Sequence, residues 1–391
     1  MITKGITRAG GAEEYLSDVT TGLSRLGHTV SIFYGTSLSE GDSVIDNIAK
    51  ISVLIKGFNR QELLARLSEF NPDVVNFQNV VDSHLLRFVS KIRPTTVFIH
   101  NHESYCPGNS KYFFNGEDIC TLPASPLCAL NGYLKGCMTR HPRKALLNIK
   151  ERFNDLNALR LLKKVICNSN YVKSNLTING VREESILVNH LFPISHERSE
   201  ITVSKDVDAV PTILFVGRLF KEKGVDHLLK ALVLLKHSFH SVIVGDGWER
   251  DSLARLAASL GIKSKVAFKG FVSRSEVADL YRRAYLLVVP SLWPEPFGLV
   301  GLEAFSHRLP VVAYGSGGVP EWLDDGQSGF IVERGNIDVL ASKIDTLLSD
   351  RSLALRLGTN GRNRVTDSFS LERHLVNLVA VYEKLYQDWD K

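Results

Sequence analysis

Several features that would place a protein in a special class are missing from this sequence. No run of about 18 apolar residues occurs, which excludes a membrane-spanning helix. Neither sign of charge dominates, because the net charge of the 391 residues is only +5, and this excludes a histone-like polycation. No apolar stretch follows the charged residues Lys4 and Arg8. We therefore expect no signal peptide and a cytoplasmic protein.

Cysteine is also scarce, with five residues in the chain, four of them between positions 106 and 137. An odd number in a chain expected to be cytoplasmic argues against a framework of disulfides. The hydrophobic content of 44% and the charged content of 23% are ordinary for a globular protein. The length favours two domains or three, and a core large enough to need no disulfide or metal.

The sequence does contain a regular alternation of short apolar runs and amphipathic stretches. In the first half, helical patterns cover 13–26 and 60–69. The apolar runs expected to be strands are 30–34, 74–77, 96–99, 164–167 and 186–188. Strands that alternate with helices predict a doubly wound, parallel α/β sheet.

A polar segment at 194–210 interrupts this alternation, and a second series follows it. Its expected strands are 213–217, 241–245, 266–268, 285–290 and 309–314, and a helix is expected at 225–235. We predict two Rossmann-like domains, an N-terminal one at 1–195 and a C-terminal one at 205–369. An amphipathic helix in 370–391 is expected to complete the first. Ligands bind at the carboxyl ends of such strands, which predicts a site in a cleft between the domains.

The first domain begins unusually. Only Met1, Ile2 and Thr3 form an apolar start before the glycine turn at Gly10 and Gly11, whereas a strand usually has about five residues. We expect the chain to begin inside its own first strand, which would weaken that side of the sheet.

The loop from Gly217 to Gly224 follows an expected strand and opens an expected helix. Glycine allows a backbone to approach a phosphate closely, and the N-terminus of a helix favours anions. Arg218 can bond two phosphate oxygens, and Lys223 adds a point charge. This loop suits a diphosphate leaving group, although a bare Gly-Arg pair would more often be a solvated basic turn.

The most informative segment is 294–303, which follows the strand at 285–290. Glu295 is expected in a loop and Glu303, eight positions later, inside a helix. Carboxylates suit paired hydroxyl donors, so one could accept sugar hydroxyls and the other ribose hydroxyls. The free N–H groups of Gly298, Leu299 and Val300 would face the diphosphate between them. Two solvated acids are the alternative, and the neighbouring Phe297, expected to be exposed, argues against it.

Three further glycine turns carry weaker signals. Gly245–Gly247 could form a tight turn under a nucleotide, and Gly315–Gly318 could line the same cleft. Gly10–Gly11 could reach the diphosphate or the acceptor. His100 and His102 end the strand at 96–99, at the edge where ligands bind. A buried structural histidine and a functional one are equally compatible with that position.

Taken together, these motifs resemble the retaining glycosyltransferases of the GT-B fold whose members carry two glutamates eight residues apart. The matching segments, in the family's order, are Gly-Gly-Ala-Glu at 10–13, 26–30, 216–224, Gly245–Gly247, 294–304 and 318–321. The resemblance implies that Arg218 and Lys223 stabilise the departing nucleoside diphosphate. It also implies that Glu295 contacts the donor sugar and Glu303 the ribose.

The same resemblance assigns further roles. Gly298, Leu299 and Val300 would give backbone N–H groups to phosphate, and Gly217 and Gly245 would lie in the nucleotide site. His100 would lie near the donor sugar, and Gly11 would pack against the diphosphate or the acceptor. Members of the family need no cofactor or divalent metal, because cationic side chains and helix ends hold the leaving group. The donor would be a UDP- or GDP-linked sugar and the acceptor a glycan or a lipid-linked acceptor of surface or exopolysaccharide biosynthesis.

The cysteines lie in a loop region expected to shape acceptor choice. Their spacing, Cys106-x13-Cys120-x7-Cys128-x8-Cys137, is not the close-paired spacing of a zinc ribbon. Reduced structural thiols, a zinc site of these four residues and disulfides all remain open.

The stretch from Lys135 to Lys164 holds nine Lys and Arg residues against Glu151 and Asp155, with Leu146, Leu147 and Ile149 among them. Such a surface could lie on an anionic membrane, at its inner face, and suit a lipid-linked acceptor. A solvated helix face is the alternative. Nucleic acid is not expected as a partner, because the charge is local and no known module accompanies it.

Two other functions fit part of this pattern: a GT-B-fold sugar-nucleotide epimerase and a catalytically silent sugar-nucleotide-binding protein. Arg218, Lys223 and the paired glutamates favour transfer over both. A nicotinamide dehydrogenase is disfavoured, because no complete Gly-x-Gly-x-x-Gly follows any expected strand.

Overall fold

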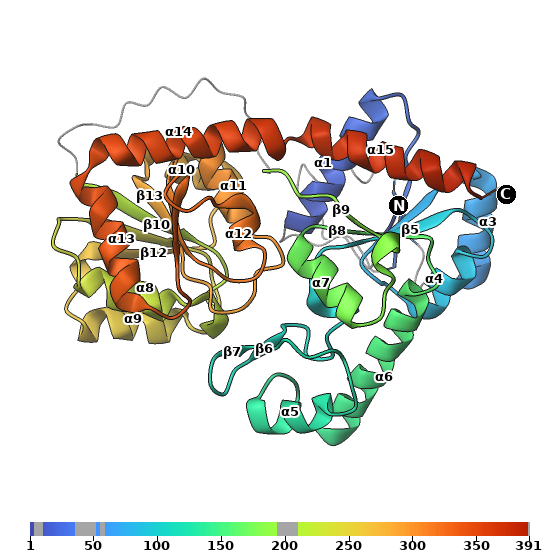
Figure 1. The fold of residues 1–391 in the computed structure, drawn as a ribbon, viewed down its shortest axis with the longest axis horizontal. Coiled ribbons are helices and arrows are strands. Elements are labelled where there is room, and N and C mark those ends of the chain that lie inside the picture. Colours follow the sequence, from blue (N-terminus) through green and yellow to red (C-terminus); the bar gives the residue numbers. More distant parts are fainter. Residues whose placement is uncertain (4–10, 36–51, 55–58, 194–209, 390–391) are drawn as a thin grey trace. The chain divides into compact units, whose positions relative to one another are not determined.

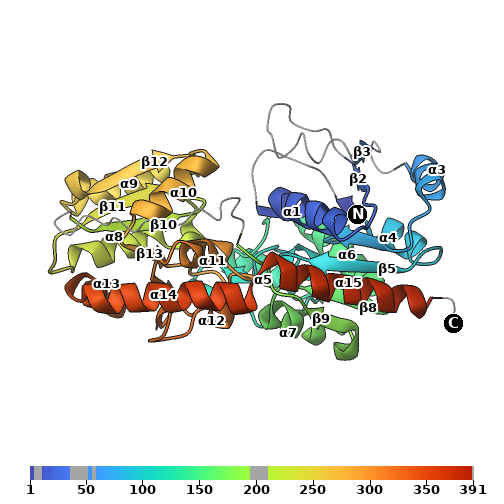
Figure 2. The same cartoon turned by 90° about the horizontal axis from the view of Figure 1, so that it is seen from above.

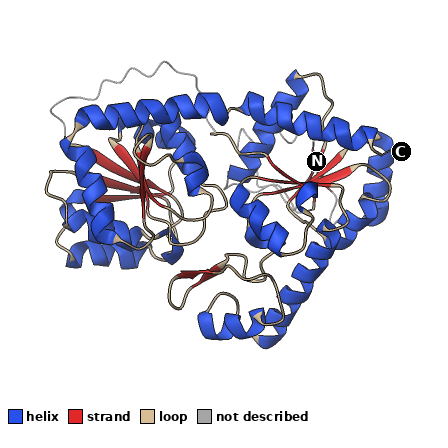
Figure 3. Cartoon of the chain, viewed as in Figure 1, coloured by secondary structure: helices blue, strands red, loops and turns tan. Residues whose placement is uncertain are grey.

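The structure is a computed structural model that describes residues 1–3, 11–35, 52–54, 59–193 and 210–389. The chain divides into two compact units, one formed by residues 1–194 with 371–391 and the other by residues 195–370. Each unit contains one parallel sheet with helices on its faces (Figures 1 and 3). No helix in the described ranges is long and apolar enough to cross a membrane.

The first unit holds a seven-stranded sheet with the order β3-β2-β1-β4-β5-β8-β9. Its strands are β1 (Ile2–Thr3), β2 (Ile32–Tyr34), β3 (Ser52–Leu54), β4 (Val75–Gln78), β5 (Thr95–Ile99), β8 (Lys164–Cys167) and β9 (Ile186–Val188). Every neighbouring pair is parallel. The strand order reverses beside β1, as in a doubly wound sheet. The short β1 therefore occupies an interior position, between β2 and β4.

Helices cover both faces of this sheet. They are α1 (Gly11–Arg25), α3 (Arg60–Phe70), α4 (Ser83–Val89), α6 (Pro142–Leu159), α7 (Asn170–Ile178) and α15 (Leu371–Gln387). Side chains alternate between the faces along each strand. On one face, Val97 and Ile99 join a core with α4 and α6. On the other, the Phe98 ring contacts Tyr15 of α1 and His374 of α15, two helices that pack against each other. Both helices are labelled in Figure 2, which views the chain from above.

The region between β5 and α6 forms a small subdomain of its own. It contains the short helix His102–Ser104, the antiparallel hairpin β6 (Tyr112–Phe113) and β7 (Asp118–Ile119), and the helix α5 (Cys128–Lys135). α5 packs against α6.

The second unit holds a six-stranded parallel sheet with the order β12-β11-β10-β13-β14-β15. Its strands are β10 (Thr212–Val216), β11 (His240–Val244), β12 (Val266–Gly270), β13 (Leu286–Val289), β14 (Val311–Tyr314) and β15 (Gly329–Val332). Its helices are α8 (Val225–Val233), α9 (Arg250–Ser259), α10 (Arg274–Arg283), α11 (Leu299–Ser306), α12 (Val319–Trp322), α13 (Ile337–Ser349) and α14 (Arg351–Ser368). The order reverses beside β10, so this sheet is also doubly wound.

The predicted α/β class with two doubly wound sheets is confirmed. The bounds of β8 and β9 agree with the predicted strands, and β5 begins one residue earlier. The sequence analysis did not predict β3, β15, the hairpin, α13 or α14. The expected linker lies outside the described residues apart from Val210, and so does Gly10.

Candidate active site

The loops at the carboxyl edge of the six-stranded sheet hold most of the predicted site residues. Because the strands are parallel, the loops after β10, β11, β13 and β14 leave the sheet at the same edge. Hydrogen bonds join neighbouring segments at this edge. Leu219 donates its N–H to the Asp246 carbonyl at 2.9 Å, and Gly245 donates to the Gly270 carbonyl at 2.9 Å. This edge is therefore one hydrogen-bonded set of loops.

Lys223 and Glu295 form a buried ion pair at this edge. The Lys223 ammonium donates to Glu295 Oε1 over 2.6 Å, and the two side chains are only 15% and 9% exposed. The Ser291 hydroxyl donates to the same oxygen at 2.6 Å. The ammonium also lies 4.8 Å from the centre of the Trp293 ring. Two groups predicted to act on different parts of the donor are thus bonded to each other.

Backbone contacts hold this pair in place. Leu292 and Trp293 both donate their N–H groups to the carbonyl of Glu222, the residue before Lys223. On the other side, Gly318 donates its N–H to the Glu295 carbonyl at 2.7 Å. Gly317 has a φ of 62°, and a Cβ there would lie 2.2 Å from the Glu295 carbonyl oxygen. Only glycine allows this approach, so the loop after β14 fixes the backbone of Glu295.

The electrostatics of Glu295 favour the carboxylate. Burial alone would raise its pKa, but the charge and hydrogen bond of Lys223, with the Ser291 hydroxyl, lower the pKa below its usual value. Glu295 is therefore a charged acceptor in a largely dry setting. Such a group can accept hydrogen bonds from hydroxyls without first shedding a proton.

Glu303 lies in the second turn of α11, and its surroundings differ. The Tyr281 hydroxyl donates to Glu303 Oε2 at 3.0 Å. Burial raises the pKa of Glu303, while the Tyr281 hydrogen bond and the charge of Arg274 act in the opposite direction. The two glutamates of the motif therefore carry opposite pKa shifts.

The start of α11 lies between the two glutamates in sequence. Gly298 precedes the helix with a φ of 102°, and Leu299 and Val300 are its first two residues. All three are partly exposed. Their N–H groups belong to the first turn of the helix, where intrahelical partners are lacking and anions are favoured.

Phe297, which the sequence analysis expected to be exposed, is only 1% exposed, and that prediction is wrong. Its ring packs against Phe369, at 5.8 Å between centroids, and its carbonyl accepts a hydrogen bond from the Trp322 indole. Phe297 therefore anchors the Glu295 loop in the core.

Arg218 is exposed, and its guanidinium lies 4.9 Å from the centre of the Phe220 ring. That ring stacks on Trp248 at 3.8 Å and 8°. Gly217 follows β10 and donates its N–H to the Val244 carbonyl, while Gly245 has a φ of 123° and lies against the Gly217 carbonyl. The two glycines bring the first loops together, and Arg218 stands outside them, available to an anion.

His100 follows β5 at the carboxyl edge of the first sheet. Its Nε2 is 2.7 Å from Gln78 Oε1, and its ring contacts those of Tyr15 and Phe98. Burial, and then the neighbouring His374, lower the pKa of His100 from 6.5 to about 3. The imidazole is therefore neutral, with Nε2 as the donor to Gln78 and Nδ1 as an acceptor. His102 is fully buried and bonds the Tyr105 hydroxyl at 2.6 Å, which favours its structural interpretation.

Gly11 is the first residue of α1. The four clustered cysteines are partly buried, and none of the five cysteines forms a disulfide. Among the described residues, no three His, Cys, Asp or Glu side chains are arranged to hold a metal ion. The zinc site considered for Cys106, Cys120, Cys128 and Cys137 therefore has no support in this geometry, and neither have disulfides. Burial, with the other three thiols, raises the pKa of Cys137 to about 12, so this thiol is protonated at neutral pH.

The basic stretch from Lys135 to Lys164 separates into two parts. In the second part, from Arg152 to Lys164, the cations bond other groups of the same chain. Arg152 pairs with Asp155, Arg160 donates to the Asn179 carbonyl, Lys163 to the Asp388 carbonyl and Lys164 to the Glu184 carbonyl. Ile149 is buried. In the first part, Lys135, Arg140, Arg143, Lys144 and Lys150 form an exposed basic surface.

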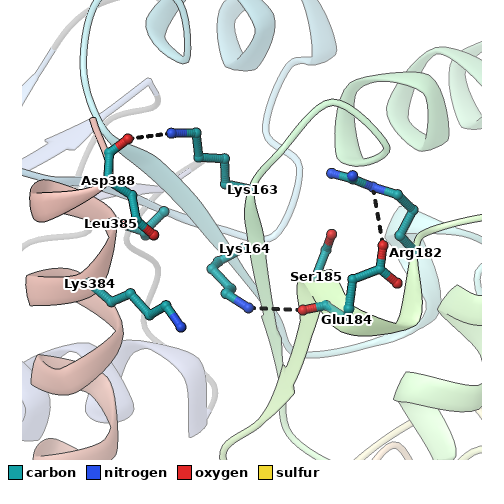
Figure 4. A pocket seen from close by; sticks show the side chains of 8 residues that line it. All are labelled: Lys163, Lys164, Arg182, Glu184, Ser185, Lys384, Leu385 and Asp388. Atoms are coloured by element: carbon teal, nitrogen blue, oxygen red, sulfur yellow. Dashed lines mark hydrogen bonds and ion pairs between the residues drawn. The ribbon is translucent and has the colours of Figure 1, made fainter. Parts of the chain in front are cut away.

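A pocket of about 430 Å³ lies beside this second part, as Figure 4 shows. Lys163, Lys164, Arg182 and Lys384 line it, together with Glu184 and Asp388. It lies where β8 and β9 begin, whereas His100 follows the carboxyl end of β5. Because substrates bind at carboxyl ends in such sheets, we do not assign the substrate to this pocket.

Sequence reasoning missed Ser291 and Tyr281, which orient the two glutamates, and the stacked pair Phe220 and Trp248. Ser291 stands four residues before Glu295, and this short spacing was the one available signal. Tyr281 comes from α10, on a different element from Glu303, so spacing along the chain gives no indication of it.

Known proteins resemble this chain in sequence and in fold. Residues 198–364 match the family model of the group 1 glycosyl transferases, and residues 9–190 match that of glycosyltransferase family 4. An uncharacterized glycosyltransferase of Methanocaldococcus jannaschii is 30% identical over 252 residues, which are 63% of this chain and 68% of that protein. The chain belongs to the group 1 glycosyl transferase family.

Two other relatives align over less of their length. A second uncharacterized glycosyltransferase of M. jannaschii is 33% identical over 61% of each chain. The alpha-D-kanosaminyltransferase of Streptomyces kanamyceticus is 30% identical over 48% of this chain and 49% of its own. The chain thus spans less than two thirds of these two relatives.

Solved structures agree on the fold. A glycosyltransferase from Rickettsia africae superposes with a TM-score of 0.72 and 22% identity over 98% of both chains. HepE of Anabaena, solved in complex with UDP-glucose, gives 0.67 and 21% over 100% of this chain and 98% of its own. This chain therefore has the GT-B fold.

Proposed function

We propose that this protein transfers a sugar, with retention of anomeric configuration, from a UDP- or GDP-linked donor to a glycan or lipid-linked acceptor. The observation that carries the proposal is the buried Lys223–Glu295 pair beside the start of α11. It combines a cation for a diphosphate and an ionised acceptor for sugar hydroxyls, and the N–H groups at the start of α11 follow Glu295 in the chain.

In this proposal the leaving diphosphate is held without a metal ion. Lys223 has three N–H donors and uses one of them for Glu295, so it can still bond a phosphate oxygen. Arg218 would form a forked pair with the phosphates. Gly298, Leu299 and Val300 would donate backbone N–H groups. Fixed donors aimed at the charge that develops on the leaving group lower the barrier to its departure.

The sugar end of the donor would be held by Glu295 and the ribose by Glu303. Glu295 is ionised and fixed through Lys223, Ser291 and the Gly318 N–H, so its carboxylate can accept hydrogen bonds from sugar hydroxyls. Neutral His100 would offer Nδ1 as an acceptor near the donor sugar, and Gly11 would pack against the diphosphate or the acceptor. We assign acceptor binding to the first unit and donor binding to the second.

The pathway proposed is surface or exopolysaccharide biosynthesis at the inner face of a membrane. The Rhizobium meliloti relative named as a lipopolysaccharide core glycosyltransferase is 28% identical over 53% of this chain, which supports an acceptor of this kind. The exposed cations of Lys135–Lys150 would contact the anionic surface.

The test is a transfer assay with UDP- and GDP-sugars and lipid-linked or oligosaccharide acceptors. We expect release of the nucleoside diphosphate that depends on the acceptor, a product whose anomeric centre matches that of the donor by NMR, and full activity in excess chelator. Inversion at that centre, or loss of activity with chelator, would contradict the mechanism. Interconversion of sugar nucleotides without an acceptor would indicate an epimerase, and binding without turnover a silent binding protein.

A further inference from the structure

Helix α5 exposes an apolar face that the sequence analysis did not identify. Leu127, Leu130, Tyr133 and Leu134 are between 55% and 65% exposed. Positions 127, 130 and 134 follow the i, i+3, i+7 spacing of one helix face, and position 133 adjoins it. We call these four residues the α5 face. Among the described residues elsewhere, large exposed apolar side chains occur singly or as adjacent pairs, so this accumulation is unusual.

The first turns of α6 add a second exposed face. Leu146 and Leu147 are 62% and 56% exposed. Arg143 and Lys150 lie one turn before and one turn after them, at the i, i+3, i+4, i+7 spacing of one side of the helix. The other side of α6 is buried through Ala145 and Ile149. We call these four exposed residues the α6 face. Its leucines are bracketed by cations.

The charge around both faces has a single sign. Residues 119–150 contain no Asp or Glu but five cations, Lys135, Arg140, Arg143, Lys144 and Lys150. All five are exposed, and within the described ranges none of them forms an ion pair. The Lys135 ammonium lies over the Phe113 ring, at 4.3 Å. Within the described residues these charges therefore have no acidic counterparts, whereas Arg152 pairs with Asp155 and the cations from Arg160 to Lys164 bond backbone carbonyls.

The two helices are neighbours and lie away from the sheet. α5 packs against α6, and in Figure 1 α5 lies beyond the hairpin β6–β7, at the end of α6 farther from the sheet. Gly132, the buried residue of α5, packs against the Met138 side chain, and the Gly108 backbone packs against the Cys137 carbonyl. These contacts hold α5 in place while its apolar face stays outward.

We propose that the α5 face and the α6 face dock this protein on an anionic lipid bilayer. Leucine and tyrosine side chains beside cations, with no acid among them, match an interfacial membrane surface. The cations would lie at the lipid phosphates, where an anionic leaflet attracts Lys and Arg, and the apolar side chains would enter the boundary below them. This deepens the proposed function, on which it rests for the choice of a lipid surface, and it extends the expected contact from charges alone to inserted side chains.

Vesicle flotation of the full chain tests the proposal. We expect wild-type protein to float with vesicles containing phosphatidylglycerol and much less with phosphatidylcholine alone. The pairs Leu130→Ser with Leu134→Ser, and Arg143→Glu with Lys144→Glu, should each reduce the bound fraction about tenfold or more. The control pair Leu355→Ser with Arg356→Glu changes exposed residues of α14 and should bind like wild type. Added salt should weaken wild-type binding.

A wild type that does not float with anionic vesicles, or α5 and α6 variants that float as well as it does, would overturn the docking surface. Thermal shifts with sugar nucleotides, measured on the α5 and α6 variants, should equal the wild-type shifts, because these substitutions leave the second unit untouched. If sugar nucleotides bind neither the wild type nor the variants while the wild type still floats with anionic vesicles, the proposed function fails and the docking surface stands.

Discussion

Lys223 and Glu295 stand 72 positions apart in the chain and share a hydrogen bond of 2.6 Å. In a site with little water, each group stabilises the charge of the other. The lysine keeps the glutamate ionised, and the glutamate holds the lysine beside the start of α11. The pair therefore does two things, since it positions a cation for the diphosphate and an acceptor for the sugar.

Removing one charge of this pair separates its two effects. In Glu295→Gln the shape remains but Lys223 loses its counter-charge. We expect the transfer rate to fall roughly a hundredfold and the free energy of unfolding to fall by about 1–3 kcal/mol. Adding Lys223→Met should restore part of the stability and none of the activity, as chemical denaturation and a transfer assay would show. Wild-type rates in either variant would remove the pair from the reaction.

The second glutamate depends on a different partner. Tyr281 donates to Glu303, and this bond opposes the rise in the Glu303 pKa that burial causes. In Tyr281→Phe we expect that pKa to rise further. As the pH is lowered, the nucleotide affinity of this variant should begin to fall at a higher pH than that of the wild type. The affinity should also be weaker than that of the wild type by roughly fivefold. Calorimetric titration with the nucleoside diphosphate at several pH values measures both the affinity and its pH dependence. Tyr285→Phe, which loses a bond to the Leu347 carbonyl, is the control and should bind normally.

At the scale of elements, the loop after β14 supports the loop that carries Glu295. A Cβ on residue 317 would meet the Glu295 carbonyl oxygen at 2.2 Å and its nitrogen at 2.6 Å. Gly326 has a similar φ, 70° against 62°, but nothing lies within 4 Å of a Cβ there. Residues 317 and 326 share the positive φ that strains any residue but glycine. They differ because only a Cβ at residue 317 would come close to other atoms.

Alanine at these two positions should therefore behave differently. Gly326→Ala should lower the free energy of unfolding by about 1–2 kcal/mol, through strain alone. Gly317→Ala should lower it further and also weaken the binding of a sugar nucleotide, because the Glu295 backbone must move. Melting temperatures and donor titrations of both variants check this. Equal effects would show that the loop does not position Glu295.

The C-terminal helix α15 joins the first unit through a buried histidine. His374 Nδ1 bonds the His190 carbonyl at 2.8 Å, and Nε2 bonds the Tyr15 hydroxyl at 3.0 Å. The carbonyl can only accept, so Nδ1 carries the proton and Nε2 accepts from Tyr15. Burial is the main reason why the pKa of His374 falls from 6.5 to about 4. The neutral ring fits its partners, and a second proton would break the bond from Tyr15.

This sets the direction of a pH effect. The pKa of His374 is lower in the folded chain than in the unfolded chain, so its contribution to stability is complete above 6.5 and is lost as the pH falls towards 4. We expect the melting temperature to fall over this window, and to fall less steeply in His374→Gln. His28→Gln, which removes an exposed histidine, should keep the wild-type slope. An unchanged slope in His374→Gln would refute this role.

At the scale of the whole molecule, local patterns predicted the two doubly wound sheets well. The strands β8 and β9 are compact apolar runs between clear breaks, so their ends are visible in the sequence. β3 and β15 were missed although they are as long as β9 and β8, and their pairing with β2 and β14 identifies them. The hairpin β6–β7 has two residues in each strand, too few for any period to show.

The candidate site was predictable as a set of positions and not as a set of contacts. Motif spacing placed Lys223 and Glu295 in loops that follow parallel strands, but their ion pair depends on how β10 and β13 pair in the sheet. The error at Phe297 has the same origin, since the ring is covered by Phe369 from a distant part of the chain. The apolar face of α5 was hidden for a related reason, because exposure is a property of packing and not of residue type.

The central claim is that the carboxyl edge of the second sheet binds a nucleoside-diphosphate sugar. A thermal-shift titration of the whole protein with a panel of UDP- and GDP-sugars tests it most directly. The account predicts that at least one donor raises the melting temperature in proportion to the logarithm of its concentration above the dissociation constant, and that Lys223→Met abolishes the response. No rise with any sugar nucleotide in the wild type, or an equal rise in Lys223→Met, would contradict it.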